Sequence, residues 1–283
     1  MIKFIYGGIM VIVNKINNIF GNIYNKLEKV QFLNGNMLKI LAMFIMFIDH
    51  FTKSFVIYNF YSIIKLLNIS YYDFYDLLKN IIWPIGSIAF PLFCFLLVEG
   101  FLHTKHLKKY LLLLFIFAII SEIPFDLAFY KDDMAVSFPF YYDYQNVFFT
   151  LFLGLITIVG IDKLKKIYSN DIKERIIAIV LSSCLIAFTS IFAEKLMTDY
   201  GAYGVLLITA MYLTRKNRIY QILSYLALFF IFKHFLNFPQ VIVSLLILLY
   251  NGNRGRLKIK YFGYIFYPAH LILLYILSLI KFW

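Results

Sequence analysis

The sequence has few of the residues that build a disulfide-rich or metal-binding protein. It contains two cysteines in 283 residues, Cys94 and Cys184, and both lie within apolar stretches. Two cysteines in such surroundings form neither a disulfide framework nor a cysteine-based metal motif. A cysteine nucleophile is also disfavoured, because no neighbouring cation would stabilise its thiolate. We therefore expect no metal and no thiol chemistry.

Charged residues are also scarce. They make up 15% of the chain, whereas 62% of the residues are hydrophobic and the mean hydropathy is +0.80. Soluble domains are about 45–50% apolar, so this composition predicts a polytopic membrane protein whose main partner is the lipid bilayer. The length allows one membrane domain and excludes a large soluble one. The net charge of +12 fits cytoplasmic loops and anionic lipid, and no nucleic-acid partner is expected.

From Asn36 onward, apolar stretches alternate with charged loops, which predicts an all-α bundle of about nine transmembrane helices. The predicted helices are 37–58, 81–102, 109–129, 145–161, 175–193, 202–214, 219–232, 238–250 and 261–280. Pro84 and Pro91 predict a kink in the second helix, and Pro124 predicts a break near the end of the third. Residues 1–35 form a separate segment, expected to be amphipathic and interfacial because its apolar run is too short to span a membrane.

Lys and Arg residues are divided unevenly between the two sides that these helices define. Twenty of the 27 lie on one side and seven on the other. Cytoplasmic loops carry an excess of Lys and Arg, so we predict a cytoplasmic N-terminus and an outside C-terminus. Abundant Ile, Lys, Asn, Tyr and Phe are typical of an AT-rich bacterial genome. We expect a multi-pass protein of the bacterial cytoplasmic (inner) membrane. On the outer side, segment 59–80 is expected to be a Tyr-rich interfacial helix, and segment 130–144 an acidic aromatic loop.

Ionisable residues within the apolar stretches form a first candidate site. Asp49 and His50 stand side by side late in the first stretch, although an aspartate at the bilayer centre costs about 2.5–3.5 kcal/mol. Helical rise predicts that several polar residues of other helices and loops reach the same outer half: Glu122, Asp126, Asn146, Asp199, Tyr200 and His270. A carboxylate could orient His50 and raise its basicity. Adjacent residues point about 100° apart on a helix, so this carboxylate could come from Asp49 or from the third helix.

A second polar group is predicted near the cytoplasmic face. Glu99 and His103 are spaced by one helical turn at the end of the second helix, and further members lie in basic loops: Lys105, Asn251, Arg254 and Arg256. Basic side chains and free backbone amides bind phosphate or a nucleotide diphosphate. Basic inner loops are also common in membrane proteins that bind no such ligand.

Each candidate also has a purely structural explanation. Asp49 could pair within the helical bundle, and Glu122 and Asp126 could satisfy backbone groups freed by the proline between them. Glu99 and His103 could form an ion pair at the membrane interface. The outer aromatic segments could bind an acceptor molecule, or they could form an aromatic belt at the bilayer surface.

Several motifs, in the same order along residues 36–283, resemble the TraX family. They are Met46–His50, Ile88–Thr104, Ser121–Asp126, Gln145–Leu151, Asp199–Gly204, Tyr250–Gly255 and Phe262–Leu271. The resemblance implies a TraX-like transmembrane acyltransferase domain over 36–283, related to the wider group of transmembrane acyltransferases. Residues 1–35 fall outside it.

The resemblance implies transfer of an acetyl group from cytosolic acetyl-CoA to an acceptor at or beyond the outer face. The acceptor would be a peptide amine, such as the N-terminus of a conjugative pilin, or a hydroxyl of a cell-surface glycan. The inner group of residues would then hold the CoA phosphates, and His50 most resembles the essential histidine of that wider group. Asn146, Asp199, Tyr200 and His270 would lie on the acceptor side. A homo-oligomer is left open.

Two other classes of function also fit the sequence. Intramembrane Asp, Glu and His residues are equally expected in a proton-coupled transporter. No inverted repeat is visible, however, and the polar residues gather at two depths rather than in one midplane site. A non-catalytic protein of conjugation or pilus assembly is the third class, and it would bind no acetyl-CoA.

Overall fold

A computed structural model describes residues 29–57, 59–130, 141–168, 170–257, 259 and 261–279. Within these ranges the regular elements are helices, and two isolated β-bridges pair residues that lie between them. The all-helical class is therefore confirmed for the described residues. Most of the predicted interfacial segment 1–35 and most of the predicted acidic loop 130–144 lie outside them.

In the first half of the chain, π-helical turns interrupt or extend the α-helices. α2 (Gly35–Phe51) continues into the π-helix η1 (Thr52–Val56), and α3 (Phe60–Leu67) follows at an angle of 99° to it. α4 (Tyr71–Leu77), η2 (Leu78–Ile82), α5 (Trp83–Gly86) and α6 (Ala89–His103) then form one helical stretch, Tyr71–His103. The Tyr-rich segment 59–80 is thus helical as predicted, but its second part is continuous with the second predicted span.

The remaining predicted stretches also form helices. They are α7 (Leu107–Phe129), α9 (Val147–Ile167), α10 (Ile172–Lys195), α11 (Gly201–Leu213), α12 (Arg218–Lys233), α13 (Phe238–Leu248) and α14 (Phe262–Ser278). Polar side chains fix several of their starts. Asn146 and Asp171 accept hydrogen bonds from backbone N–H groups in the first turns of α9 and α10, and Asn217 does the same for α12.

Four helical stretches among the described residues are long and apolar enough to cross a membrane. They are Tyr71–His103, Leu107–Phe129, Val147–Ile167 and Ile172–Lys195. Gly35–Val56 and Phe60–Leu67 add a fifth if this bent pair is one span. α11, α13 and α14 are apolar but shorter, with 13, 11 and 17 residues. The protein is a multi-pass helical membrane protein, while nine spans and the side of each terminus remain predictions.

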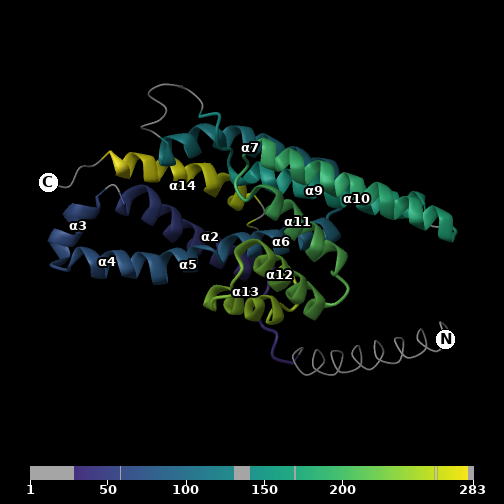
Figure 1. The fold of residues 1–283 in the computed structure, drawn as a ribbon, viewed down its shortest axis with the longest axis horizontal. Coiled ribbons are helices and arrows are strands. Elements are labelled where there is room, and N and C mark those ends of the chain that lie inside the picture. The colour runs from purple at the N-terminus through teal and green to yellow at the C-terminus, as the bar shows by residue number, and fades with distance from the viewer. Residues whose placement is uncertain are drawn as a thin grey trace.

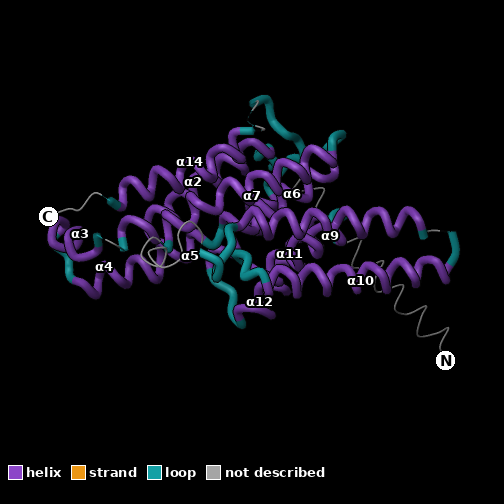
Figure 2. The backbone as a smooth tube through the Cα atoms, turned by 90° about the horizontal axis from the view of Figure 1, so that it is seen from above, coloured by secondary structure: helices purple, strands orange, loops and turns teal. Residues whose placement is uncertain are grey.

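The helices pack around α6, α7 and α9. α14 lies against α7 and α2, and α9 lies between α7, α10 and α11 (Figure 1). α6 contacts α2 and α11, and its residues Leu92, Cys94 and Phe95 are fully buried. Viewed at right angles, α9 and α10 extend beyond the rest of the bundle as a pair (Figure 2). This packing brings α2 and α14 together, although they lie at opposite ends of the described chain.

The prolines of the second and third predicted helices have different effects. The break near Pro124 does not occur, because α7 continues through this residue to Phe129. Pro91 is the third residue of α6, where its missing N–H would have no helical partner. The helical stretch is interrupted at Ser87 and Ile88, between Pro84 and Pro91, where the kink was predicted.

Candidate functional site

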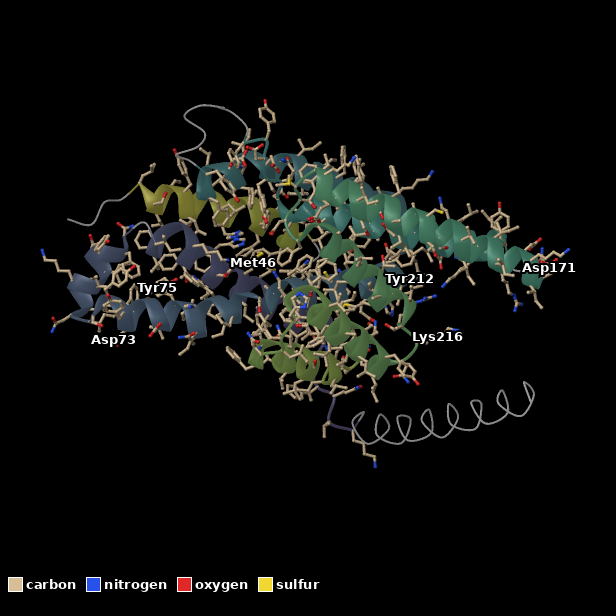
Figure 3. All side chains as sticks on the ribbon, viewed as in Figure 1. Met46, Asp73, Tyr75, Asp171, Tyr212 and Lys216 are labelled. Carbon is tan, nitrogen blue, oxygen red and sulfur yellow. The ribbon has the colours of Figure 1, made fainter. Side chains whose placement is uncertain are left out.

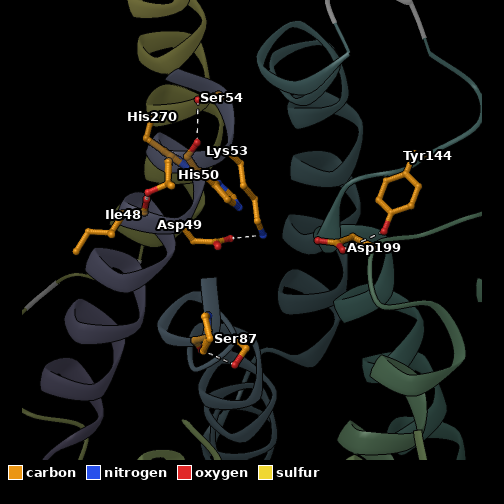
Figure 4. Close-up of polar contacts among 11 residues, drawn as sticks. Ile48, Asp49, His50, Lys53, Ser54, Ser87, Tyr144, Asp199 and His270 are labelled. Carbon is orange, nitrogen blue, oxygen red and sulfur yellow. Dashed lines mark hydrogen bonds and ion pairs between the residues drawn. The ribbon is translucent and has the colours of Figure 1, made fainter. Parts of the chain in front are cut away.

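Two histidines from distant parts of the chain meet in the bundle. His50 near the end of α2 and His270 in α14 place Nδ1 and Nε2, respectively, 2.8 Å apart. Their rings are stacked, with centroids 5.1 Å apart and planes 14° apart. Figure 4 shows the two rings side by side where α2 and α14 meet. The structure therefore joins His50, predicted as catalytic, to His270, predicted on the acceptor side.

The hydrogen-bond partners of this pair determine where the protons lie when both rings are neutral. Nδ1–H of His270 donates to the carbonyl oxygen of Phe266, at 2.9 Å. His270 Nε2 must then be the acceptor, so Nδ1–H of His50 donates to it. A neutral imidazole carries one proton, and His50 Nε2 is left with a lone pair. The α14 backbone thereby makes His50 Nε2 a base.

Aromatic rings enclose the histidine pair. Phe129 and Tyr267 contact the His50 ring edge-on, at centroid distances of 5.1 and 6.1 Å. Phe266 stacks on His270 at 4.9 Å. His270 is 4% exposed and Tyr267 is 3% exposed. These rings restrict the access of water and hold both imidazoles in fixed orientations.

Asp49 faces a different partner from His50. Its Oδ2 accepts a hydrogen bond from the ammonium of Lys53, one turn along, at 2.7 Å. Oδ1 is buried and has no hydrogen-bond partner. In Figure 4 the Lys53 ammonium lies between the carboxylates of Asp49 and Asp199. Lys53 belongs to the π-helical turn η1, and such turns are frequent at functional sites. Asp49 therefore contributes charge next to His50 rather than a bond to its imidazole.

Asp199 is positioned by a short parallel bridge between the loops before α9 and before α11. Thr198 pairs with Gln145, and the backbone N–H of Asp199 donates to the Gln145 carbonyl at 2.8 Å. The Thr150 hydroxyl donates to the Asp199 carbonyl, and the Tyr144 hydroxyl donates to Asp199 Oδ1 at 3.4 Å. Burial raises the pKa of Asp199 to about 6, although Lys53 lowers it, while the charge of Asp49 raises it further.

Glu122 and Asp126 bind backbone and capping groups. The side-chain amide of Asn146 donates to Glu122 Oε2 and to the Ala118 carbonyl, and the Asn146 backbone N–H donates to the same carboxylate at 3.3 Å. Asp126 Oδ2 accepts from the Tyr141 backbone N–H at 2.9 Å. These two carboxylates, predicted as catalytic, thus hold the start of α9 and the preceding loop against α7. Neither makes a hydrogen bond to His50.

Tyr200 is held in an unusual conformation. Its φ of +66° lies in the left-handed region, which is uncommon for a bulky residue. Its ring stacks on Phe90 of α6, with centroids 3.6 Å apart and planes 4° apart. This contact fixes the turn that presents Asp199.

The predicted inner residues only partly come together. Arg218 of α12 donates to Glu99 Oε1 at 3.4 Å and to Gln221 Oε1 at 3.0 Å, and its guanidinium lies over the rings of Phe95 and Tyr250. His103 Nδ1 bonds to the Glu99 carbonyl rather than to its carboxylate, at 2.8 Å. Glu99 therefore belongs to a partly buried ion pair with Arg218, and no ion pair with His103 forms.

The loop with Asn251, Arg254 and Arg256 is tied to the start of α2. Asn251 N–H donates to the Leu33 carbonyl at 2.8 Å, and Asn36 N–H donates to the Arg254 carbonyl at 2.9 Å. The side chains of Arg254, Arg256 and Lys105 are exposed. This connection places the start of α2 beside the loop before α14.

Sequence reasoning missed three residues of these groups. Lys53 is not among the predicted site residues, although its spacing of four residues from Asp49 indicates the pair. Tyr267 carries no signal beyond its place in an aromatic run. Arg218 lies just before the predicted helix 219–232, and only the folded structure brings it to Glu99 of α6.

Comparisons with known proteins agree with this arrangement of motifs. No solved structure matches the chain. A curated relative, named probable fimbrial assembly protein FimC of serogroup H1 from Dichelobacter nodosus, is 32% identical over 210 residues. These residues cover 67% of this chain and 80% of the relative. The family described as TraX protein matches residues 34–278, which contain both histidines and every predicted site residue. The chain therefore belongs to the TraX family.

Proposed function

We propose that the protein is a membrane-embedded acyltransferase that moves an acetyl group from acetyl-CoA to an amine or hydroxyl acceptor. The observation that carries this proposal is the hydrogen-bond chain Phe266–His270–His50, which leaves His50 Nε2 as a base in an aromatic enclosure. The name of the Dichelobacter nodosus relative supports a role in fimbrial or pilus assembly. The acceptor would be a pilin-type amine or a cell-surface glycan.

In the proposed reaction, His50 Nε2 takes the proton of a hydroxyl or neutral amine as the acceptor attacks the thioester carbonyl carbon. A bond from acceptor oxygen or nitrogen to this carbon forms, and the carbon–sulfur bond breaks. The protonated His50 then returns its proton to the departing thiolate of CoA. During this cycle His50 keeps its Nδ1–H bond to His270, so the ring does not need to turn. General acid–base catalysis of this kind contributes about 10²–10⁴ in rate.

Acetyl-CoA supplies the activated acetyl group as a thioester. Lys105, Arg254 and Arg256 have exposed side chains and suit its phosphates. At the other side of the site, Asp49 and Asp199 flank Lys53, and their charges suit an acceptor that carries an amine. We infer that donor and acceptor reach the histidines from opposite ends of the bundle.

The test compares two histidine-to-asparagine variants. His50→Asn keeps a donor near the position of Nδ1 but has no atom equivalent to Nε2, so acetyl transfer should fall at least about 100-fold. His234→Asn is the matched control, since His234 is exposed at a left-handed position that asparagine tolerates. Purified protein would be incubated with radiolabelled acetyl-CoA and membrane extract, and the labelled product identified. Wild-type rates in His50→Asn would overturn the assignment.

A proton-coupled transporter is the second candidate, and the buried carboxylate oxygen of Asp49 without a partner favours it. Thermal unfolding separates the two candidates. Stabilisation by acetyl-CoA or CoA supports the acyltransferase. Stabilisation by an ion or metabolite, with none by CoA, supports the transporter.

A further inference from the structure

A cavity of about 470 Å³ lies between α9, α10 and the end of α11, away from the histidine pair. Its walls are mainly apolar and include Ile161 of α9, Ala178 and Ile186 of α10, and Leu213 of α11. Neither histidine and none of the residues predicted for catalysis or donor binding lines it. The cavity is therefore separate from the candidate site at His50.

Basic side chains line one part of this cavity. Lys165 of α9 and Arg175 of α10 both belong to the lining, and the lining includes no carboxylate. Arg215 and Lys216 lie close enough to act electrostatically on Lys165. Asp162, which also acts on Lys165, is held by Lys166 at 2.7 Å and by the Tyr212 hydroxyl at 2.8 Å. Figure 3 shows Tyr212 and Lys216 toward the same end of the bundle as Asp171 at the start of α10.

The cavity lies next to the surface that faces lipid. Ile179 belongs to its lining and is 63% exposed. The neighbouring outer face of α10 exposes Ile176 and Val180, and such an apolar face is covered by acyl chains in a bilayer. An occupant that diffuses in the membrane plane can therefore reach the cavity.

One polar atom inside the cavity has no partner. The hydroxyl Oγ of Ser182 is buried without a hydrogen bond, and Ser182 lines the cavity two turns beyond Arg175 on α10. A buried hydroxyl without a partner is destabilising, so it favours an occupant that brings an acceptor. The ester carbonyl of a glycerolipid is such an acceptor.

We propose that this cavity binds one anionic phospholipid. Its phosphate contacts Lys165 and Arg175, an ester carbonyl accepts from Ser182, and an acyl chain fills the apolar part. Basic pockets between helices on the basic side of a membrane protein recognise anionic headgroups in this way. The site does not depend on the proposed acyl transfer.

Native mass spectrometry of detergent-purified full-length protein, titrated with phosphatidylglycerol or phosphatidylcholine, tests the proposal. Phosphatidylglycerol should bind more tightly. Lys165→Gln should weaken its binding about fivefold, and Lys165→Gln with Arg175→Gln about 25-fold. Lys173→Gln removes the same charge from an exposed residue outside the lining and should change nothing. Ser182→Leu fills the cavity while keeping both cations, and it should also weaken binding. Size-exclusion profiles would verify that each variant is folded.

Three results would overturn the proposal. Equal binding of the two lipids would show that Lys165 and Arg175 do not select an anionic phospholipid. Full competition by inorganic phosphate would assign the site to a free anion. Loss of CoA binding in Lys165→Gln, with unchanged lipid binding, would assign it to the acyl donor. His50→Asn should bind lipid like the wild type, which separates this proposal from the acyltransferase.

Discussion

The backbone of Gly86 packs directly against the carboxylate of Asp49. A methyl group added at this glycine would lie 2.1 Å from Asp49 Oδ1 and 2.4 Å from its Cγ. The contact joins α5 to α2 beside the ion pair of Asp49 with Lys53. Only glycine leaves room for the carboxylate at this position, so the charged group beside His50 is positioned by a neighbour that has no side chain.

Gly86→Ala should therefore destabilise the protein by about 1–3 kcal/mol, because Asp49 must move to relieve the overlap. Thermal unfolding in detergent measures this loss. Gly35→Ala is the control, since a methyl group there meets its nearest atoms at an ordinary 3.6 Å. An unchanged midpoint in Gly86→Ala would show that the contact between α5 and α2 is loose.

His270 should act through His50. In His270→Phe the acceptor of His50 Nδ1–H is lost, so the proton is free to move to Nε2, and kcat should fall about 100-fold or more. His270→Gln offers a side-chain oxygen near the position of Nε2 and should recover part of this loss. Steady-state kinetics on both variants provide the measurement. Equal losses in the two variants would indicate a role in packing alone.

The carboxyl group of Asp199 should make stability depend on pH. Its pKa is raised to about 6 by burial, so the folded protein holds this proton more tightly than the unfolded chain does. The resulting stabilisation is complete below about pH 4, the unfolded value, and is lost as the pH rises through 6. Asp199→Asn should thus match the wild type at pH 4 and have the higher melting midpoint at pH 7. A constant difference across this range would contradict the shifted pKa.

Asn146 and Glu122 should prove structural rather than catalytic. Asn146→Ala removes the cap of α9 and the side-chain donor to Glu122, and it should cost about 2–3 kcal/mol or more. Glu122→Gln preserves the size of the side chain and should retain most of the acetyl transfer. Loss of transfer in a folded Glu122→Gln variant would restore the catalytic role predicted from the sequence.

The ion pair of Arg218 with Glu99 can be tested by a double-mutant cycle. Both side chains are 12% exposed, so Arg218→Met leaves the largely desolvated charge of Glu99 without its partner and should cost up to about 3–5 kcal/mol. Arg218→Met with Glu99→Gln should be more stable than Arg218→Met alone. If Glu99 instead binds the donor, Glu99→Gln alone should weaken stabilisation by CoA, with little effect on unfolding.

The sequence predicts where helices form better than it predicts their lengths and the side chains that meet between them. Apolar stretches locate α2, α6 and α7 because lipid and core both require apolar residues at these positions. The length of the helix that starts at Tyr71 could not be predicted, since Tyr and Asp residues in it suggest an interface. Helix α7 continues through Pro124 because neighbouring helices can compensate for a missing hydrogen bond, and no local pattern reveals this.

For the candidate site, the sequence likewise predicts the depth of residues in the membrane but not their side-chain partners. Helical rise predicts the depth of His50 and His270, and the structure joins them. Helical rise does not determine which way a side chain faces, so Glu122 was predicted beside His50 although it holds Asn146. Lys53 lies one turn from Asp49, and that pair could be read from spacing alone.

The bond between His50 and His270 joins residues that are 220 positions apart. During synthesis, α2 must enter the bilayer long before α14 is made. The nascent chain therefore carries His50 without its acceptor until α14 has been made. The proposed acetyl transfer would begin only when α14 docks, so a chain that ends before α14 should be inactive in the membrane.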